Sequence, residues 1–255
     1  MRPMGAVIDA VHAACVAPGY LTAAPCTRRA GDTTGCHHSQ REMSAMKIGI
    51  LGSGNVGQSL AKGLKGLGHD VVIGSSAGNK LAAFSAETGV AEQKFADAVA
   101  GAHVVIVALK GQGAEEIVRG LAGSLAGKVV LDATNPIAGE AKGGIVPYFT
   151  GPNDSLLQRL QKAAPGAKFV KCFNSVAAHV MVKPHFKSGT PAMFICGDDA
   201  EAKATTTKLL AELGWAAEDV GGSEAGNAVE ALCQLWCAPG FLRNDWSHAY
   251  AVLRS

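Results

Sequence analysis

The pattern of apolar and polar positions alternates along the chain between two periods. Short apolar runs are typical of strands, and the continuous run 103–109 is typical of a parallel strand buried on both faces. Elsewhere apolar residues recur at helical spacing, as at Leu60, Leu64 and Leu67. Strands are predicted at 47–51, 69–74, 103–109, 128–132, 168–173, 191–196 and within 214–220, and helices at 58–67, 81–88, 97–101, 114–125, 155–164, 200–213 and 222–237. This alternation predicts an α/β protein with a mostly parallel sheet.

A glycine turn joins the first predicted strand to the first predicted helix. Gly52, Gly54 and Gly57 have the G-x-G-x-x-G spacing, with a strand before and a helix after them, as a dinucleotide site requires. Gly52 permits the tight turn, Gly54 has no side chain to block a pyrophosphate, and Gly57 lets helix and strand pack closely. Phosphates are then expected on free N–H groups at the helix N-terminus, in a Rossmann-type sheet. The alternative is an ordinary loop in a chain that holds 32 glycines.

The two ends of the chain differ from this pattern. Residues 1–45 keep neither period, so we expect a poorly ordered N-terminal extension or the product of an upstream start codon. A signal peptide is disfavoured, because the weakly apolar segment 10–17 is interrupted by His12. Residues 46–182 are predicted to form the dinucleotide-binding Rossmann domain, and residues 183–255 a small C-terminal α/β extension.

Composition excludes several classes of function. Lys and Arg number 23 and Asp and Glu 21, so nothing draws the protein strongly to nucleic acid or to an anionic membrane. No stretch approaches the roughly 18–20 apolar residues of a membrane span. The seven cysteines are irregularly spaced, and we expect reduced thiols in a cytoplasmic protein. Cys233 and Cys237 are expected to be apolar neighbours on one helix face rather than half of a metal site, and no metal is predicted.

The segment that leaves the second predicted strand carries no acid. NAD enzymes usually place a carboxylate there for the ribose hydroxyls. Residues 74–80 instead contain Ser75, Ser76 and Lys80, which suit the 2′-phosphate of NADP, so NADP is favoured over NAD. The alternative is that Ser75, Ser76 and Asn79 only form a turn and cap the next helix.

Polar residues also follow the later strands, at the sheet edge where such folds hold ligands. Lys110 and Asn135 each follow a predicted strand, and Asn135 is also an ordinary turn starter before Pro136. We expect a second pocket against the nicotinamide, lined by the Asn135 loop, residues 174–178 and either Tyr148 or Phe149.

The predicted cofactor site gathers the glycine turn, the loop after the second strand and the ends of the later strands. Its residues are Gly52, Ser53, Gly54, Asn55, Val56, Gly57, Ser75, Ser76, Lys80, Leu109, Lys110, Asn135, Pro136, Asn174 and Ala178. No catalytic residue is assigned, and a structural role is favoured for His179. Hydride transfer needs two rings held face to face, while the cofactor itself supplies the reactivity.

Four segments resemble a known family, namely 47–57, 73–76, 170–178 and 196–203. They are similar to NADP oxidoreductases that use the 8-hydroxy-5-deazaflavin coenzyme, and to relatives of unknown substrate. The resemblance implies a Rossmann domain, a homodimer, and hydride transfer between NADPH and a flat tricyclic ring stacked on the nicotinamide. It also implies that Ser53 and Ser75 lie near the adenine-side phosphate, and that the backbone of Ala178 meets the nicotinamide carboxamide.

Two positions depart from that family. Asn174 stands where the deazaflavin enzymes carry histidine, and Ser76 where they carry an arginine that clamps the 2′-phosphate. Ser76 is uncharged, so only Lys80 is left to replace that arginine, and the NADP prediction is weaker. The predicted function is that of an NADP-dependent oxidoreductase with a flavin-like (deazaflavin) or quinone-like small-molecule acceptor. The alternatives are a same-fold reductase of a carbonyl, imine or metal-chelate substrate, and a non-catalytic NADP-binding redox sensor.

Overall fold

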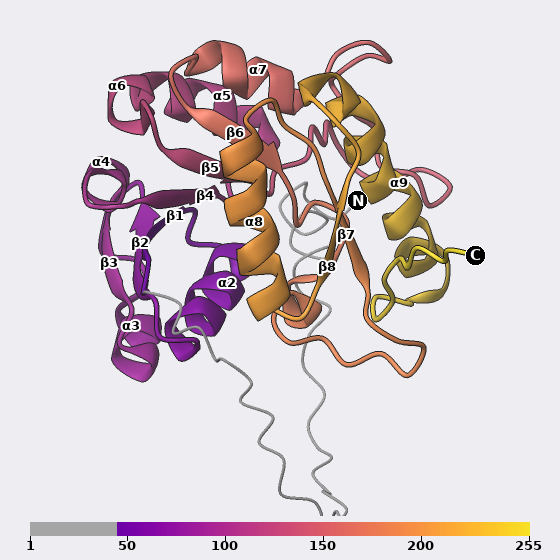
Figure 1. Cartoon of the computed structure of the whole chain (residues 1–255), viewed down its shortest axis with the longest axis horizontal. Helices are drawn as coiled ribbons and strands as arrows, with labels where there is room; N and C mark the ends of the chain where they lie inside the picture. The colour runs from indigo at the N-terminus through magenta and orange to yellow at the C-terminus, as the bar shows by residue number, and fades with distance from the viewer. Residues whose placement is uncertain (1–44) are drawn as a thin grey trace, which may run out of the picture.

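The computed structural model describes residues 45–255, so the extension predicted for residues 1–45 lies outside the described residues except for Ala45. A six-stranded sheet has the order β3-β2-β1-β4-β5-β6, and all of its pairs are parallel (Figure 1). Its strands are β1 (Lys47–Leu51), β2 (Asp70–Ser75), β3 (Ala91–Lys94), β4 (Val104–Val107), β5 (Val129–Asp132) and β6 (Lys168–Lys171). The predicted Rossmann-type fold is confirmed. The chain adds strands outward from β1 to β3 on one side and then returns to the centre to add β4, β5 and β6 on the other side.

Helices cover both faces of the sheet. One face carries α2 (Asn55–Gly66), α3 (Ala82–Thr88) and α8 (Ala200–Glu212), and the other carries α4 (Phe95–Ala100), α5 (Gly111–Gly120), α6 (Ala122–Leu125) and α7 (Leu156–Ala163). Alternate residues of one strand therefore enter different cores: Ile106 packs on the α2 side and Val105 on the α4 side. The continuous apolar run of β4 is buried throughout for this reason.

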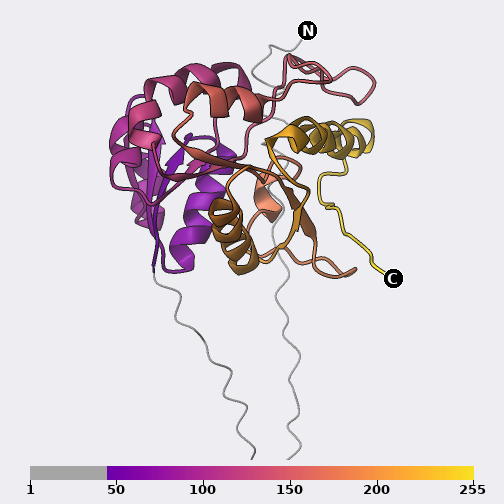
Figure 2. The same cartoon turned by 45° about the horizontal axis from the view of Figure 1, so that its top comes forward.

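A smaller C-terminal part lies beside β6 (Figures 1 and 2). It contains the parallel pair β7 (Ala192–Ile195) and β8 (Ala216–Asp219), the long helix α9 (Gly226–Arg243), and the short helices η1 (Ala178–Val180) and η2 (Ser223–Ala225). A single bridge between Lys171 and Cys196 joins it to the edge of the main sheet. In both views α9 runs beside the loop that follows β5.

Three sequence predictions were wrong in detail. Strand β3 was missed, because its residues Ala-Glu-Gln-Lys form no apolar run and lie at the edge of the sheet. The helix predicted at 114–125 begins earlier and is divided into α5 and α6. The last helix does not end at residue 237 but continues through Pro239 to Arg243, where Asn244 adopts a left-handed conformation.

Each glycine of the turn meets the steric demand that its spacing predicts. A Cβ on Gly52, whose φ is +130°, would lie 2.2 Å from the carbonyl oxygen of Ala108, and a Cβ on Gly57 would lie 1.9 Å from the carbonyl oxygen of Gly52. A Cβ on Gly54 would meet nothing within 4 Å. Gly52 and Gly57 therefore let backbone segments touch, whereas Gly54 leaves open the space beside the turn.

Gly57→Ala is expected to lower the melting temperature, because its new methyl group overlaps the backbone of the glycine turn. Overpacking of this kind costs about 1–3 kcal/mol. Gly66→Ala is the matched control in the same helix, since a Cβ there meets nothing within 4 Å. The control is expected to be neutral or stabilising, because Gly is unfavourable in helices. Equal melting temperatures for the two variants would contradict the steric role of Gly57.

Candidate functional site

A cavity of about 340 Å³ opens at the carboxyl ends of β1 and β4, next to the glycine turn. We call it the glycine-turn cavity, and it is lined by Gly52, Ser53, Gly54, Asn55, Val56, Ser76, Phe95, Ala108, Leu109, Lys110 and Ala133. This is the point at which the strand order reverses, where open α/β sheets bind their ligands.

The N-terminus of α2 gives the cavity an anion-binding end. Its N-cap residue, Gly54, has an extended backbone and no side chain, and the first turn of the helix contains no acidic residue. The first N–H groups of a helix have no partner within it, and the helix dipole favours negative charge there. The open space beside Gly54 therefore fits a pyrophosphate bound by backbone N–H groups.

The loop after β2 brings two of the predicted phosphate contacts together. The ammonium of Lys80 donates a hydrogen bond to the hydroxyl of Ser76 at 3.0 Å, and Ser76 lines the cavity. Ser75 is only 1% exposed. Its hydroxyl donates to Glu92 at 2.6 Å and accepts from the N–H of Gly78 at 2.8 Å, so its polar contacts lie within the protein.

The acid missing from this loop is supplied by the neighbouring strand. Glu92 of β3 accepts hydrogen bonds from Ser75 and from the N–H groups of Lys80 and Leu81. Burial raises the pKa of Glu92, but these three hydrogen bonds and the positive charge of Lys80 together lower it overall. Sequence reasoning missed Glu92 because it lies in the unrecognised strand β3. Phe95, which follows β3 and lines the cavity, was missed for the same reason.

A smaller pocket of about 40 Å³ adjoins the cavity, and the two share Val56 and Ala133. We call it the inner pocket, and it is lined by Val56, Ala133, Asn135, Phe173, Asn174, Val176, Ala178, Met181, Cys233 and Trp236. Its lining includes Asn135, Asn174 and Ala178, as expected for the second pocket. Helix α9 contributes two further residues, Cys233 and Trp236, which sequence reasoning left out.

Tyr148 and Phe149 are not among the residues that line the inner pocket. The hydroxyl of Tyr148 donates to the carbonyl oxygen of Glu230 at 2.7 Å, and the ring of Phe149 lies 5.5 Å from the guanidinium carbon of Arg159. Tyr148 therefore ties the loop after β5 to α9 instead of facing a ligand.

Two amide side chains join the ends of β5 and β6 across the inner pocket. Asn135 donates from Nδ2 to the carbonyl oxygen of Asn174 at 2.7 Å. Asn174 donates from its own Nδ2 to Asn135 Oδ1 at 3.3 Å and to the carbonyl oxygen of Val229 at 2.8 Å. The preceding residue, Phe173, has a φ of 58°, a strained left-handed conformation that accompanies the sharp exit from β6.

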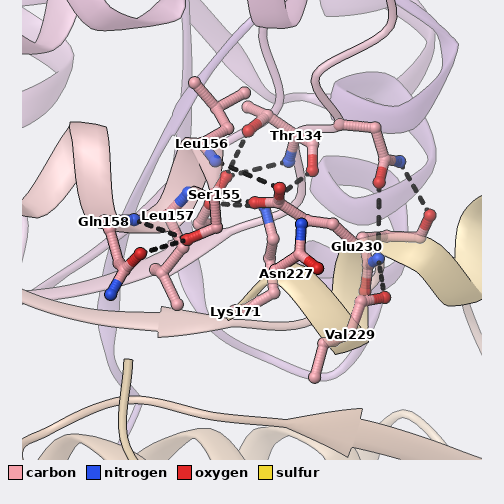
Figure 3. Close-up of polar contacts among 12 residues, drawn as sticks. Thr134, Ser155, Leu156, Leu157, Gln158, Lys171, Asn227, Val229 and Glu230 are labelled. Carbon is pink, nitrogen blue, oxygen red and sulfur yellow. Dashed lines mark hydrogen bonds and ion pairs between the residues drawn. The ribbon is translucent and has the colours of Figure 1, made fainter. Parts of the chain in front are cut away.

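A buried ionic network surrounds Lys171 and Glu230 (Figure 3). The ammonium of Lys171 lies 2.7 Å from Asp132 and 2.9 Å from Glu230, and it donates to the carbonyl oxygen of Thr134 at 2.8 Å. The side chains of Lys171, Asp132 and Glu230 are all 0% exposed. Figure 3 shows Glu230 reaching from α9 to Leu156 and Leu157. Its carboxylate accepts a hydrogen bond from the backbone N–H of each residue, at 3.0 Å in both cases.

All three charges of this network are satisfied by their neighbours. Asp132 accepts from both the N–H and the hydroxyl of Thr134. The carboxylate of Glu230 pairs with Lys171 and accepts from two backbone N–H groups. Burial alone would lower the pKa of Lys171, but the two carboxylates raise it above its ordinary value. The network is therefore an ammonium held between two carboxylates.

Sequence reasoning missed this network entirely. A signal for part of it was present, because Asp132 and Lys171 end two apolar strands and lie opposite each other in the parallel register. Opposite charges on paired strands attract, so this contact was open to prediction. Glu230 gave no such signal, because the packing of α9 on the ends of β5 and β6 does not follow from local sequence.

The predicted residues divide into three groups. Those that line the glycine-turn cavity are Gly52, Ser53, Gly54, Asn55, Val56, Ser76, Leu109 and Lys110, and those that line the inner pocket are Val56, Asn135, Asn174 and Ala178. Gly57, Ser75, Lys80 and Pro136 line neither. His179 is on the exposed side of the chain, and its Nε2 lies 3.1 Å from the hydroxyl of Ser247. Partial removal of its ring from water lowers its pKa.

Within residues 45–255, no group of three or more His, Cys, Asp or Glu residues is placed to hold a metal ion. None of the helices in this part of the chain is long and apolar enough to cross a membrane. The cytoplasmic location and the homodimer expected from the sequence stay predictions.

Comparison with known proteins agrees with this geometry. Residues 47–136 match the family described as "NADP oxidoreductase coenzyme F420-dependent". A structure assigned as an F420-dependent NADP reductase from Arthrobacter sp. FB24 is 31% identical with a TM-score of 0.77, and the match covers 82% of this chain and 100% of that one. A hypothetical protein from Sinorhizobium meliloti is 27% identical with a TM-score of 0.63, over 72% of this chain and 89% of that one.

Among curated proteins, the metalloreductase STEAP3 from Rattus norvegicus is 32% identical over 203 residues. That match covers 78% of this chain but spans only 39% of the length of the relative. The fold and the glycine-turn cavity define a dinucleotide-binding oxidoreductase. The chain belongs to the NADP oxidoreductase family.

Lys171→Met is expected to lower the free energy of unfolding by about 3–5 kcal/mol, because it leaves two buried carboxylates without their cation. The control is Lys168→Met on the same strand, whose partly exposed ammonium pairs with Asp199. That change is expected to cost about 0–1 kcal/mol. Chemical denaturation measures both. In the background of Lys171→Met, Glu230→Gln is expected to recover part of the loss, and equal losses for the two lysine variants would contradict the network.

Proposed function

We propose that the protein transfers a hydride between NADP(H) and a small conjugated acceptor, of the flavin-like (deazaflavin) or quinone-like class. The observation that carries this proposal is the adjacency of two pockets of different chemistry. The glycine-turn cavity fits a pyrophosphate, and the inner pocket adjoins it at Val56 and Ala133. The family's description and the name of the Arthrobacter relative both support coenzyme F420, a deazaflavin, as an acceptor to test first.

The 2′-phosphate of NADP is proposed to bind at the loop after β2. Ser76 lines the cavity, and the ammonium of Lys80 is held next to its hydroxyl. Glu92 stabilises the conformation of this loop, because its carboxylate accepts hydrogen bonds from the backbone N–H groups of Lys80 and Leu81. With the carboxylate engaged in this way, Ser76 and Lys80 remain to bind a phosphate.

When bound, the nicotinamide supplies the hydride, and the protein supplies position. Gly54 and the N-terminus of α2 hold the pyrophosphate, and the paired amides of Asn135 and Asn174 fix the loops around the inner pocket. Phe173 and Trp236 give this pocket apolar walls that exclude water from the reacting atoms. A redox sensor without activity would need no such second pocket, so the reductase is the better reading of the geometry.

Ser76→Glu is expected to weaken NADPH binding by about tenfold or more, because the added carboxylate repels the 2′-phosphate. NADH binding is expected to weaken much less. Titration of the purified protein with each nucleotide, followed by nicotinamide fluorescence, measures both affinities. Ser124→Glu is the matched control, since Ser124 is exposed on α6 and lines neither pocket. Preferred binding of NADH by the unaltered protein would contradict the proposed phosphate site.

Oxidation of NADPH is expected to require an acceptor that reaches the inner pocket. The decrease in nicotinamide absorbance would be followed with a deazaflavin, a flavin and a quinone in turn. A bulky side chain at the pocket wall, as in Ala178→Leu, is expected to lower turnover with any active acceptor. Tight NADPH binding with no oxidation by all three acceptors would contradict the proposed acceptor classes and leave the nucleotide site intact.

A further inference from the structure

The outer face of α9 is both apolar and exposed. Figures 1 and 2 show this helix at the edge of the molecule, with the loop after β5 beside it. Leu235 and Leu242 of α9 are 61% and 63% exposed, and Ile145 of that loop is 46% exposed. Single exposed apolar side chains are ordinary, but a group of them on one surface marks an interaction site.

The apolar residues of this face have the spacing of a helix–helix contact. Five of them lie at alternating intervals of three and four along α9, and we call them the outer stripe: Ala228, Ala231, Leu235, Ala238 and Leu242. Four of the five are exposed, and Ala238 is half-buried. Residues at these intervals line one side of a helix, as positions a and d of a coiled coil do.

The polar residues of α9 face the protein and not the solvent. Asn227 donates hydrogen bonds to the carbonyl oxygens of Gly151 and Asp154, Gln234 donates to that of Val146, and Glu230 is buried in the ionic network. A surface helix ordinarily has the reverse arrangement, with its apolar side inward and its polar side in water. The orientation of α9 therefore indicates that another protein surface covers the outer stripe.

A second copy of the same chain matches the stripe and its two ends. A two-fold axis places the same patch on both sides of a contact, so the patch must be complementary to itself. The stripe is uncharged, with exposed Glu224 of η2 just before α9 and exposed Arg243 at its end. Antiparallel helices bring each Arg243 towards the partner's Glu224, whereas parallel helices would bring like charges together.

The size of the contact requires the loop after β5 as well. A stable interface buries about 800 Å² on each partner, which is more than the five small and medium-sized residues of the stripe provide. A Cβ on Gly144 would lie 2.8 Å from Cγ of Leu242, so the tip of this loop packs against the C-terminal end of the stripe. Ile145 therefore extends the apolar surface beyond α9.

We propose that two copies of the chain associate through the outer stripes of α9, antiparallel about a two-fold axis near Leu235. Leu242 of each copy then lies opposite the partner's Ala228, a large residue against a small one. This inference does not rest on the proposed function, and it gives the homodimer expected from the sequence a surface and a symmetry. Cys233 and Trp236 line the inner pocket from the other side of α9, so the partner helix supports the wall of that pocket.

Light scattering after size-exclusion chromatography tests the surface on the full chain. The unaltered protein is expected at twice the chain mass of 26.0 kDa. Leu235→Glu is expected to raise the dissociation constant of the dimer at least about tenfold, because two carboxylates then meet in an apolar contact. The matched control is Leu253→Glu, since Leu253 is 93% exposed and its neighbour Arg254 pairs with Glu218 of β8. A monomeric unaltered protein, or a dimer that Leu235→Glu leaves intact, would overturn the inference.

Cysteine cross-linking tests the direction of the helices without introducing a charge. Leu235→Cys is expected to form a disulfide between subunits on mild oxidation, because the axis places the two copies of this position side by side. Ala228→Cys alone is expected to give only the background set by the protein's own cysteines, and Ala228→Cys combined with Leu242→Cys to cross-link. Cross-linking by Ala228→Cys alone, or none by Leu235→Cys, would contradict the antiparallel arrangement.

Discussion

The ammonium of Lys171 between Asp132 and Glu230 is the interaction on which the inner half of the site depends. It joins β5, β6 and α9, and Glu230 extends the connection to the first turn of α7. A buried charge is costly unless its partners are kept in place, so these four segments cannot separate independently. Val229, whose carbonyl oxygen accepts a hydrogen bond from Asn174, and Cys233, which lines the inner pocket, lie on the same helix as Glu230. The network thus sets the position of α9 relative to the sheet.

The outer half of the site depends on backbone rather than on charge. Gly52 and Gly57 allow contacts that any side chain would prevent, and Gly54 leaves the helix N-terminus open. The two halves meet at Val56 and Ala133, one from the glycine turn and one from the end of β5. The close backbone contacts of the glycine turn therefore shape the nucleotide end of the site. The buried ionic network positions the end where the acceptor is proposed to bind.

The sequence predicted those parts of the fold that local chemistry dictates. Apolar runs predicted β1 and β4, and glycine spacing predicted the turn, because each depends on residues next to it in the chain. It did not predict β3, whose polar residues pair only because β2 lies beside them. In the site, Ser76, Asn135 and Asn174 follow strands and could be found, whereas Glu230 and Trp236 come from a helix distant in the chain. Long-range packing, and not local preference, places those two residues.

The position of Glu92 links nucleotide preference to the shape of a loop. In an enzyme with an acid at the end of its second strand, that acid can bind ribose directly. Here the carboxylate comes from the adjoining edge strand, and the hydroxyl and backbone groups of residues 75–81 occupy it. To bind a ribose, the carboxylate would have to break its hydrogen bonds to those donors, and the loop would no longer be stabilised by them. A change of coenzyme in this lineage is thus a problem of remodelling a turn rather than of exchanging one side chain.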